Sequence, residues 1–163
     1  MTPLFTKLNL GSHRDILVVN APGNFEPELS ALTGVTIRRD PKPLTEIPYA
    51  LVFVQTLAEV EAAAKWLPKA VGDAVIWFAY PKGSSKRYRC EFNRDTGWAA
   101  VGAAGFEGVR LVSIDEDWSA FRFRRTEFIK SLNREEPRAS SPAGKARLKN
   151  KDKPASSDGK RTK

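Results

Sequence analysis

A chain of 163 residues with 41% hydrophobic and 10% aromatic residues can bury one core of ordinary size, which excludes an intrinsically disordered protein. One cysteine, Cys90, excludes an intrachain disulfide, and Cys90 with the single His13 excludes a zinc site of the usual thiolate and imidazole kind. The sequence has neither a run of about 20 apolar residues, as a bilayer requires, nor the apolar core of a signal peptide. We therefore expect a cytoplasmic protein without membrane association.

The formal net charge of +8 is concentrated at the carboxyl end. Residues 131–163 contain ten Lys and Arg against four Asp and Glu, so this segment carries +6 of the total. It is rich in Ser, Pro, Lys and Ala, and it has too few apolar side chains to offset the entropy lost on ordering. We predict a single domain over 1–132 and a disordered basic tail over 133–163. The tail is either a solubilising segment or a weak electrostatic arm for nucleic acid or another polyanion.

The first half of the chain alternates short strands with short helices. A helix start is predicted at Thr2-Pro3, because proline fits the first helical turn. Apolar runs of strand length predict strands that are buried on both faces. In chain order the predicted elements are a helix over 2–10, a strand over 15–19, a helix over 26–32, a strand over 35–37 and a strand over 50–54.

The second half begins with the best-marked helix of the sequence. Thr56 and Glu59 have the spacing of a capping box, in which each side chain satisfies a free backbone N–H, and apolar residues follow at helical spacing up to Leu67. The remaining predicted elements are a turn at Gly72-Asp73, a strand over 74–80, a helix capped by Asn93 or Asp95 and closed by Gly105, an antiparallel hairpin of strands 109–114 and 119–123, and a helix over 126–132.

This order of elements predicts an α/β fold. We expect a Rossmann-like, three-layer domain with a mostly parallel sheet, helices on both faces, right-handed crossovers and a C-terminal antiparallel hairpin. The topology over residues 15–125 resembles the sheet of class I methyltransferases, trimmed by one strand–helix unit. In that resemblance the final hairpin takes the position of the family's last two strands.

Ligands of open α/β sheets bind outside the carboxyl ends of the parallel strands. Here that edge holds the basic loop after strand 74–80. If strand 109–114 runs in the same direction as strand 74–80, the acidic turn at 115–117 joins this edge and lies near the loop. The candidate ligand-binding residues are Tyr80, Lys82, Gly83, Ser84, Ser85, Lys86, Asn93, Asp95, Asp115, Trp118 and Arg122.

The basic loop does not match the known phosphate-binding loop. It contains one glycine and lacks the Gly-Lys-Ser/Thr of a P-loop. Gly83 can still let the backbone approach an anion, with Lys82, Lys86 and the serine hydroxyls as donors. The alternative is a flexible turn whose lysines only pair with the acids at 115–117.

We expect no cofactor and no metal. The loop over 20–25 follows the first strand but lacks Gly-x-Gly-x-x-Gly, and Pro22 removes a backbone donor where a phosphate would need one. Asp40 could stand for the ribose-binding acid of such folds, but two arginines crowd it. The acids at 115–117 offer oxygens to a divalent cation, although three consecutive acids in a hairpin are usually solvated.

Other polar and aromatic residues have structural roles in our interpretation. Arg122 needs a partner in a half-buried strand, and Asp115 is the predicted one. Arg94 and Asp95 are predicted to form a surface pair. The tryptophans predicted to lie in the core are Trp66, Trp77 and Trp98.

Three motifs resemble a family of small bacterial proteins of unknown function. They are IWFAYPKGSSK over 76–86, FNRDTGW over 92–98 and DEDWSAFRFR over 115–124, and the resemblance covers nearly all of residues 1–130. It implies a bacterial, cytoplasmic origin and no assigned activity or cofactor.

Three functions fit these observations. The first is a non-catalytic binding module for an anionic small ligand or a protein partner. The second is an enzyme of unknown reaction, in which Lys82 or Lys86 stabilises charge and Asp95 or Asp115 acts as general base. The third is nucleic-acid association through the tail, assisted by the basic residues of 86–89.

Overall fold

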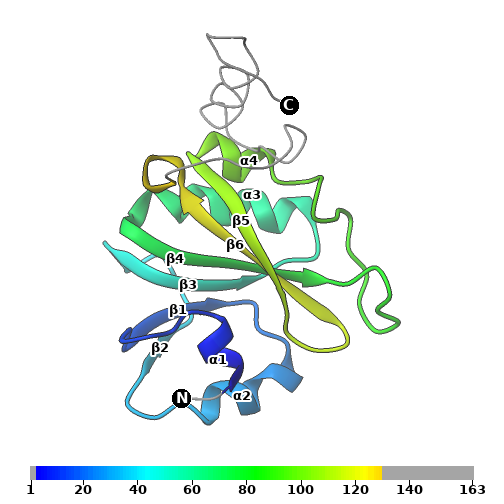
Figure 1. Ribbon diagram of the computed structural model, residues 1–163, viewed down its shortest axis with the longest axis horizontal. Helices are drawn as coiled ribbons and strands as arrows, with labels where there is room; N and C mark the ends of the chain where they lie inside the picture. Colours follow the sequence, from blue (N-terminus) through cyan, green and yellow to red (C-terminus); the bar gives the residue numbers. More distant parts are fainter. Residues whose placement is uncertain (1–2, 130–163) are drawn as a thin grey trace, which may run out of the picture.

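Six strands form one mixed sheet in the order β2-β1-β3-β4-β6-β5 (Figure 1). The computed structural model describes residues 3–129. The strands are β1 (Asp15–Val19), β2 (Thr36–Arg38), β3 (Ile47–Phe53), β4 (Ala70–Pro81), β5 (Phe106–Ser113) and β6 (Trp118–Arg125). The helices are α1 (Pro3–Lys7), α2 (Glu26–Ser30), α3 (Leu57–Trp66) and α4 (Ala99–Ala103), with 3-10 turns at Gly23–Phe25, Leu67–Lys69 and Thr126–Phe128.

The strand directions confirm the predicted fold class. Strands β1 to β4 are parallel to one another, and β6 is antiparallel to both β4 and β5. Strand β5 therefore runs in the same direction as β4, which is the condition for the acidic turn to reach the basic loop. Strand β1 lies between β2 and β3, so the strand order reverses at β1. This reversal is the Rossmann-like arrangement of an open sheet.

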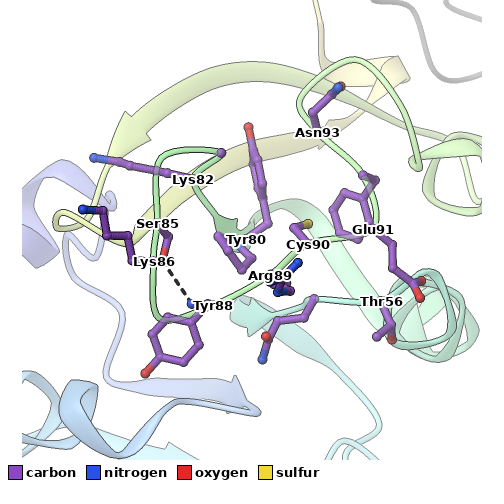
Figure 2. A pocket seen from close by; sticks show the side chains of 14 residues that line it. Thr56, Tyr80, Lys82, Ser85, Lys86, Tyr88, Arg89, Cys90, Glu91 and Asn93 are labelled. Carbon is purple, nitrogen blue, oxygen red and sulfur yellow. Dashed lines mark hydrogen bonds between the residues drawn. The ribbon is translucent and has the colours of Figure 1, made fainter.

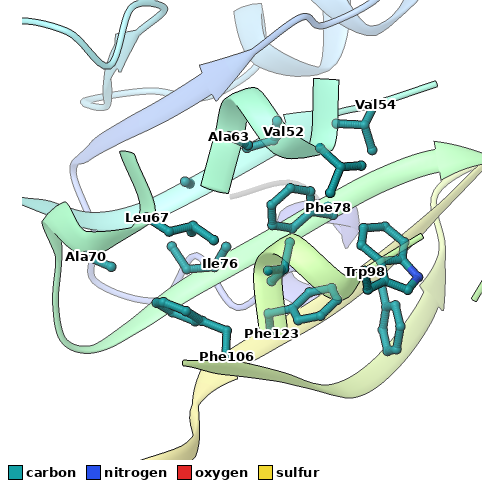
Figure 3. Close-up of a cluster of buried hydrophobic side chains, with 14 of the residues drawn as sticks. Val52, Val54, Ala63, Leu67, Ala70, Ile76, Phe78, Trp98, Phe106 and Phe123 are labelled. Carbon is teal, nitrogen blue, oxygen red and sulfur yellow. The ribbon is translucent and has the colours of Figure 1, made fainter. Parts of the chain in front are cut away.

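Helices cover both faces of the sheet, because the parallel strands carry apolar side chains on both sides. Alternate residues of the central strands separate into two cores. Val52 and Phe78 lie in the core under α3 and α4, while Leu51 and Trp77 lie in the core under α1 and α2. Figure 3 shows the first core, where Trp98 packs edge-on against Phe78 with ring centroids 5.6 Å apart. The three tryptophans predicted to lie in the core, Trp66, Trp77 and Trp98, are all buried.

Helix α3 begins at the predicted capping box. Thr56 Oγ1 accepts a hydrogen bond from the backbone N–H of Glu59 at 3.1 Å, and Glu59 Oε1 accepts one from the backbone N–H of Thr56 at 3.2 Å. The helix then buries Val60, Ala63 and Trp66 against the sheet. This local sequence signal fixes where the chain leaves the carboxyl end of β3.

Three predicted boundaries are wrong. Gly72 and Asp73 do not precede the fourth strand but lie inside it, at a bulge where the register with β3 shifts and Gly72 has φ +56°. Asn93 and Asp95 do not cap α4, whose N-cap is Trp98; the Asn93 Oδ1 instead accepts from the backbone N–H of Asp95 at 2.8 Å. Over the described part of the predicted helix 126–132, the chain forms a 3-10 turn, Thr126–Phe128, and is extended at Ile129; residues 130–132 lie outside the described residues.

The predicted disordered tail over 133–163, and nucleic-acid binding through it, lie outside the described residues. Both stay predictions, as does the single-domain boundary at 132. Within residues 3–129, every helix is too short or too polar to cross a membrane.

Candidate functional site

A groove of about 910 Å³ opens at the carboxyl ends of β3 and β4 (Figure 2). The end of β3 contributes Gln55 and Thr56, the end of β4 contributes Tyr80 and Pro81, and the loop that follows β4 forms the remaining wall. The groove therefore lies at the edge of the sheet that the strand directions predicted. From the loop, the lining residues are Lys82, Gly83, Ser85, Lys86, Tyr88, Arg89, Cys90, Glu91, Phe92 and Asn93.

The first part of the loop is attached to the acidic turn between β5 and β6. The backbone N–H of Lys82 donates to the Asp117 carbonyl at 2.8 Å, and Ser85 Oγ donates to Asp117 Oδ1 at 2.8 Å. Ser85 Oγ also accepts from the backbone N–H groups of Arg87 at 3.3 Å and Tyr88 at 3.1 Å. The basic loop and the acidic turn are thus neighbours, joined by the Lys82 amide and the Ser85 hydroxyl.

The far end of the loop is attached to the start of α3. The backbone N–H of Glu91 donates to the Gln55 carbonyl at 3.0 Å, and Glu91 Oε1 accepts from the backbone N–H of Leu57 at 2.9 Å. Glu59 Oε1 accepts from the backbone N–H of Gln55 at 2.7 Å. Carboxylates stabilise a helix N-terminus, and here Glu91 accepts from the first N–H of α3.

Three basic side chains, Lys82, Lys86 and Arg89, line the groove, whereas Glu91 is the one acid that the described residues contribute to its lining. Lys82 Nζ donates to Ser113 Oγ at 2.7 Å. Lys86 and Arg89 are exposed and form no ion pair within residues 3–129. Neither Lys82 nor Lys86 forms an ion pair with the acids at 115–117, so the predicted alternative is wrong about this pairing. The groove is therefore electrostatically positive.

Tyr80 forms the base of the groove on β4. It is 6% exposed and packs against Phe92 and Trp98, with ring centroids 6.0 and 5.7 Å away. Burial raises the pKa of Tyr80 to about 12, so its hydroxyl stays protonated at neutral pH and can donate a hydrogen bond. Burial also raises the pKa of the half-buried Cys90 thiol, which keeps the sulfur in its less reactive form.

The neighbouring position, between the ends of β1 and β3, is filled by aromatic side chains. Phe53 lies between Phe25 and Trp118, with ring centroids 4.9 and 5.1 Å away, and Trp118 packs on Tyr88 at 4.9 Å. Asn20 Nδ2 donates across to the Phe53 carbonyl at 3.3 Å. This is the switch point at which open α/β sheets usually bind ligands. In this protein the groove lies one strand further along.

The structure brings six of the predicted site residues together in the groove: Tyr80, Lys82, Gly83, Ser85, Lys86 and Asn93. Ser84 and Asp95 are exposed outside its lining. Asp115 Oδ1 accepts from the backbone N–H groups of Asp117 and Trp118 at 2.8 and 2.9 Å, so this carboxylate closes the hairpin turn. Trp118 is buried beneath Tyr88. Their assignment as ligand-binding residues stays a prediction.

Arg122 lies away from this edge, and its predicted pairing with Asp115 is wrong. Its position opposite Trp77 places it in the middle of β6, on the face covered by α1. There Arg122 Nη1 donates to Asn9 Oδ1 at 3.0 Å. The predicted surface pair of Arg94 and Asp95 is confirmed at 3.6 Å.

The lining residues from Tyr88 to Phe92 were not in the predicted site. The sequence gives one usable signal for them. The segment between Pro81 and Trp98 has neither helical nor strand periodicity, which indicates that the predicted loop continues through it. Over residues 3–129, no three His, Cys, Asp or Glu side chains come together in a way that could hold a metal ion.

No family model matches the sequence, and no curated protein matches it. Among solved structures, LepI in complex with SAM is 12% identical with a TM-score of 0.44, over 77% of this chain and 47% of that chain. A pericyclic reaction enzyme gives 13% identity and the same coverage and score. A protein in the NADB-Rossmann superfamily from Streptococcus agalactiae is 10% identical with a TM-score of 0.44, over 92% of this chain and 82% of that chain.

This chain spans about half the length of the LepI chain. At such identities and scores, these likenesses carry no argument about a ligand or a reaction. Function must instead be inferred from the sheet order and the groove, which belong to this chain itself.

Proposed function

We propose that this chain is a non-catalytic binding module, and that the groove at the ends of β3 and β4 takes an anionic small ligand. The observation that carries the proposal is the pair of unneutralised cations, Lys86 and Arg89, on a concave surface of about 910 Å³. Grooves of this size are typical of small-molecule sites, whereas protein partners usually meet flatter surfaces. A small ligand is therefore favoured over a protein partner.

The lining supplies both charge and orientation. Lys86 and Arg89 would neutralise the ligand, and charge-assisted hydrogen bonds of this kind are about twice as strong as neutral ones. The protonated Tyr80 hydroxyl and the Asn93 amide also belong to the lining (Figure 2). They would orient a polar group of the ligand.

The state of the nucleophilic groups supports binding rather than catalysis. Ser85 Oγ already donates to Asp117 and accepts from the loop backbone, and no imidazole takes part in this arrangement. Burial disfavours the Cys90 thiolate. His13 is half-buried beside Tyr49, a member of the core on the α1 face, with ring centroids 5.5 Å apart. Hydrolysis or acyl transfer would need a nucleophile and a base in contact, which these positions do not supply.

Isothermal titration of the full chain tests the proposal. The panel consists of mononucleotides, sugar phosphates and dicarboxylates. We expect at least one compound to bind, and the double substitution Lys86→Gln with Arg89→Gln to weaken that binding by tenfold or more. Arg87→Gln is the matched control, because Arg87 is an exposed arginine of the same loop that does not line the groove. The proposal is wrong if no compound of the panel binds, or if the double variant binds as tightly as the unaltered chain.

A further inference from the structure

A second group of basic side chains lies in the middle of the β5–β6 hairpin. Arg110 of β5 is directly opposite Arg122 of β6, so both side chains are on the same face of the sheet. That face is the one covered by α1, because Arg122 is also opposite Trp77, which belongs to the core under α1. Arg110 is exposed and Arg122 is half-buried.

Within the described residues, Asp73 acts on the charge of Arg122 but is itself paired with Arg124. The neighbouring Arg124 is paired, because its Nε donates to Asp73 Oδ1 at 3.0 Å. By contrast, Arg110 and Arg122 form no ion pair with any residue in 3–129. Arg122 has one hydrogen bond, to Asn9, and its buried Nε has no partner within the described residues.

This arrangement costs the fold stability. Like charges directly opposite each other on neighbouring strands destabilise a sheet, with Cβ atoms about 4.5–5.5 Å apart. A buried N–H without an acceptor adds the penalty of desolvation. Burial lowers the pKa of Arg122, and the nearby Arg124 and Arg110 also lower it, although Asp73 and Tyr49 act in the opposite direction. A local conflict of this kind is expected where a side chain serves a ligand rather than the fold.

We propose that Arg110 and Arg122 form a second anion site, which binds the phosphate group of a small ligand. Two arginines at facing positions of neighbouring strands match a doubly charged tetrahedral anion, since guanidinium groups donate charge-assisted hydrogen bonds to its oxygens. The phosphate would remove the repulsion between them. The site is separate from the groove, which lies at the carboxyl ends of β3 and β4. A pair of arginines beside α1, rather than a long basic stripe, favours a single phosphate over a nucleic-acid backbone.

His13 provides a reporter for this site. It is the only histidine of the chain, so its imidazole signals need no assignment. Burial lowers its pKa and Arg122 lowers it further, while the Tyr49 ring packs against it and Arg14 Nη1 donates to its carbonyl. A phosphate bound at Arg122 would cancel part of the positive potential that acts on the imidazole. The pKa of His13 must then rise.

The experiment is a proton NMR titration of the full chain in inorganic phosphate and in sodium chloride of equal ionic strength. We expect phosphate to raise the His13 pKa above its value in chloride, with a saturable dependence on phosphate concentration. Arg110→Gln should weaken the apparent phosphate affinity by tenfold or more, since it removes one charged donor pair. Arg110 is exposed on an edge strand, so this variant keeps the fold, and Arg87→Gln is again the control with the same change of charge.

Two results would overturn the second site. One is an equal His13 pKa in phosphate and chloride, and the other is unchanged phosphate affinity in Arg110→Gln. If Lys86→Gln with Arg89→Gln abolished the His13 response, the phosphate would belong to the groove and the second site would also fall. Glycerol phosphate distinguishes a phosphate ester from free phosphate as the ligand. A larger shift of the His13 pKa than with inorganic phosphate identifies an ester, and an equal shift identifies phosphate itself.

Discussion

Ser85→Ala tests whether one hydroxyl couples the groove to the rest of the fold. The Ser85 hydroxyl donates to Asp117 Oδ1 at 2.8 Å, and Asp117 is 5% exposed. Removing this donor leaves a buried carboxylate with one fewer hydrogen bond. Hydrogen bonds to charged groups contribute about 1.5–3 kcal/mol, so we expect the free energy of unfolding to fall by about 2 kcal/mol. The amides of Arg87 and Tyr88 also lose their acceptor, but water can replace it at this half-exposed position.

Urea unfolding followed by tryptophan fluorescence measures this loss. With a slope of about 2 kcal/mol per molar urea, typical of a domain of this size, the midpoint should fall by about 1 M. Ser84→Ala is the matched control, because Ser84 is the adjacent serine, is exposed and takes no part in the bonds between loop and turn. We expect Ser84→Ala to shift the midpoint by less than about 0.25 M, in line with other exposed substitutions.

Ser85→Ala should also loosen the loop locally. Since the loop is attached at Glu91 as well, losing the first attachment should raise amide hydrogen exchange between Lys82 and Tyr88 more than in α3. Equal midpoints for Ser84→Ala and Ser85→Ala would refute the role that we give to the hydroxyl. Uniform exchange over the whole chain would refute the local coupling.

Further predictions concern the groove wall and pH. Gly97→Ala should destabilise the fold by about 2–4 kcal/mol in urea unfolding, because Gly97 has φ +89° and an added Cβ would lie 2.5 Å from the Phe92 Cβ. The control is Gly34→Ala, which is also at positive φ but faces open space and should cost about 1 kcal/mol. In a spectrophotometric titration the Tyr80 hydroxyl should ionise near pH 12, and because its folded pKa is raised, its contribution to stability is lost as the pH rises above about 10. The folded pKa of His13 is lowered, so its contribution to the free energy of unfolding is present above about pH 6.5 and is lost as the pH falls. Unfolding midpoints measured between pH 5 and 8 should therefore decline toward acid. This decline should be absent in His13→Gln.

The order of elements was predictable because burial leaves a direct mark on the sequence. The apolar runs at 15–19 and 50–54 are strands buried on both faces, and the Thr56 capping box fixes the start of α3. Because parallel strands have their carboxyl ends at one edge, the basic loop and the acidic turn were expected to be neighbours if strand 109–114 ran in the same direction as strand 74–80. The strand pairings fulfil this condition, and the Lys82 amide and the Ser85 hydroxyl join the two segments.

The incorrect predictions depend on contacts that a single sequence does not encode. The partner of Arg122 is set by the register of β6 against β4, which carries the guanidinium to Asn9 rather than to the nearby turn. The predicted capping of α4 failed because Asn93 has a better local use, a turn that its own side chain closes. The far wall of the groove was missed because a loop without periodicity gives no pattern from which to place its side chains.

The aromatic row at the end of β1 bears on how such folds change their ligands. Phe25, Phe53 and Trp118 occupy the position where the sheet topology alone would locate a cofactor, so the groove of this molecule lies away from that position. The groove wall, in contrast, is a connecting segment outside the two cores for most of its length. Its exposed positions, such as Ser84, Lys86 and Arg89, can be altered without repacking the sheet, whereas Tyr88 and Phe92 pack against the cores. The exposed positions are therefore the natural place to redesign specificity on this scaffold.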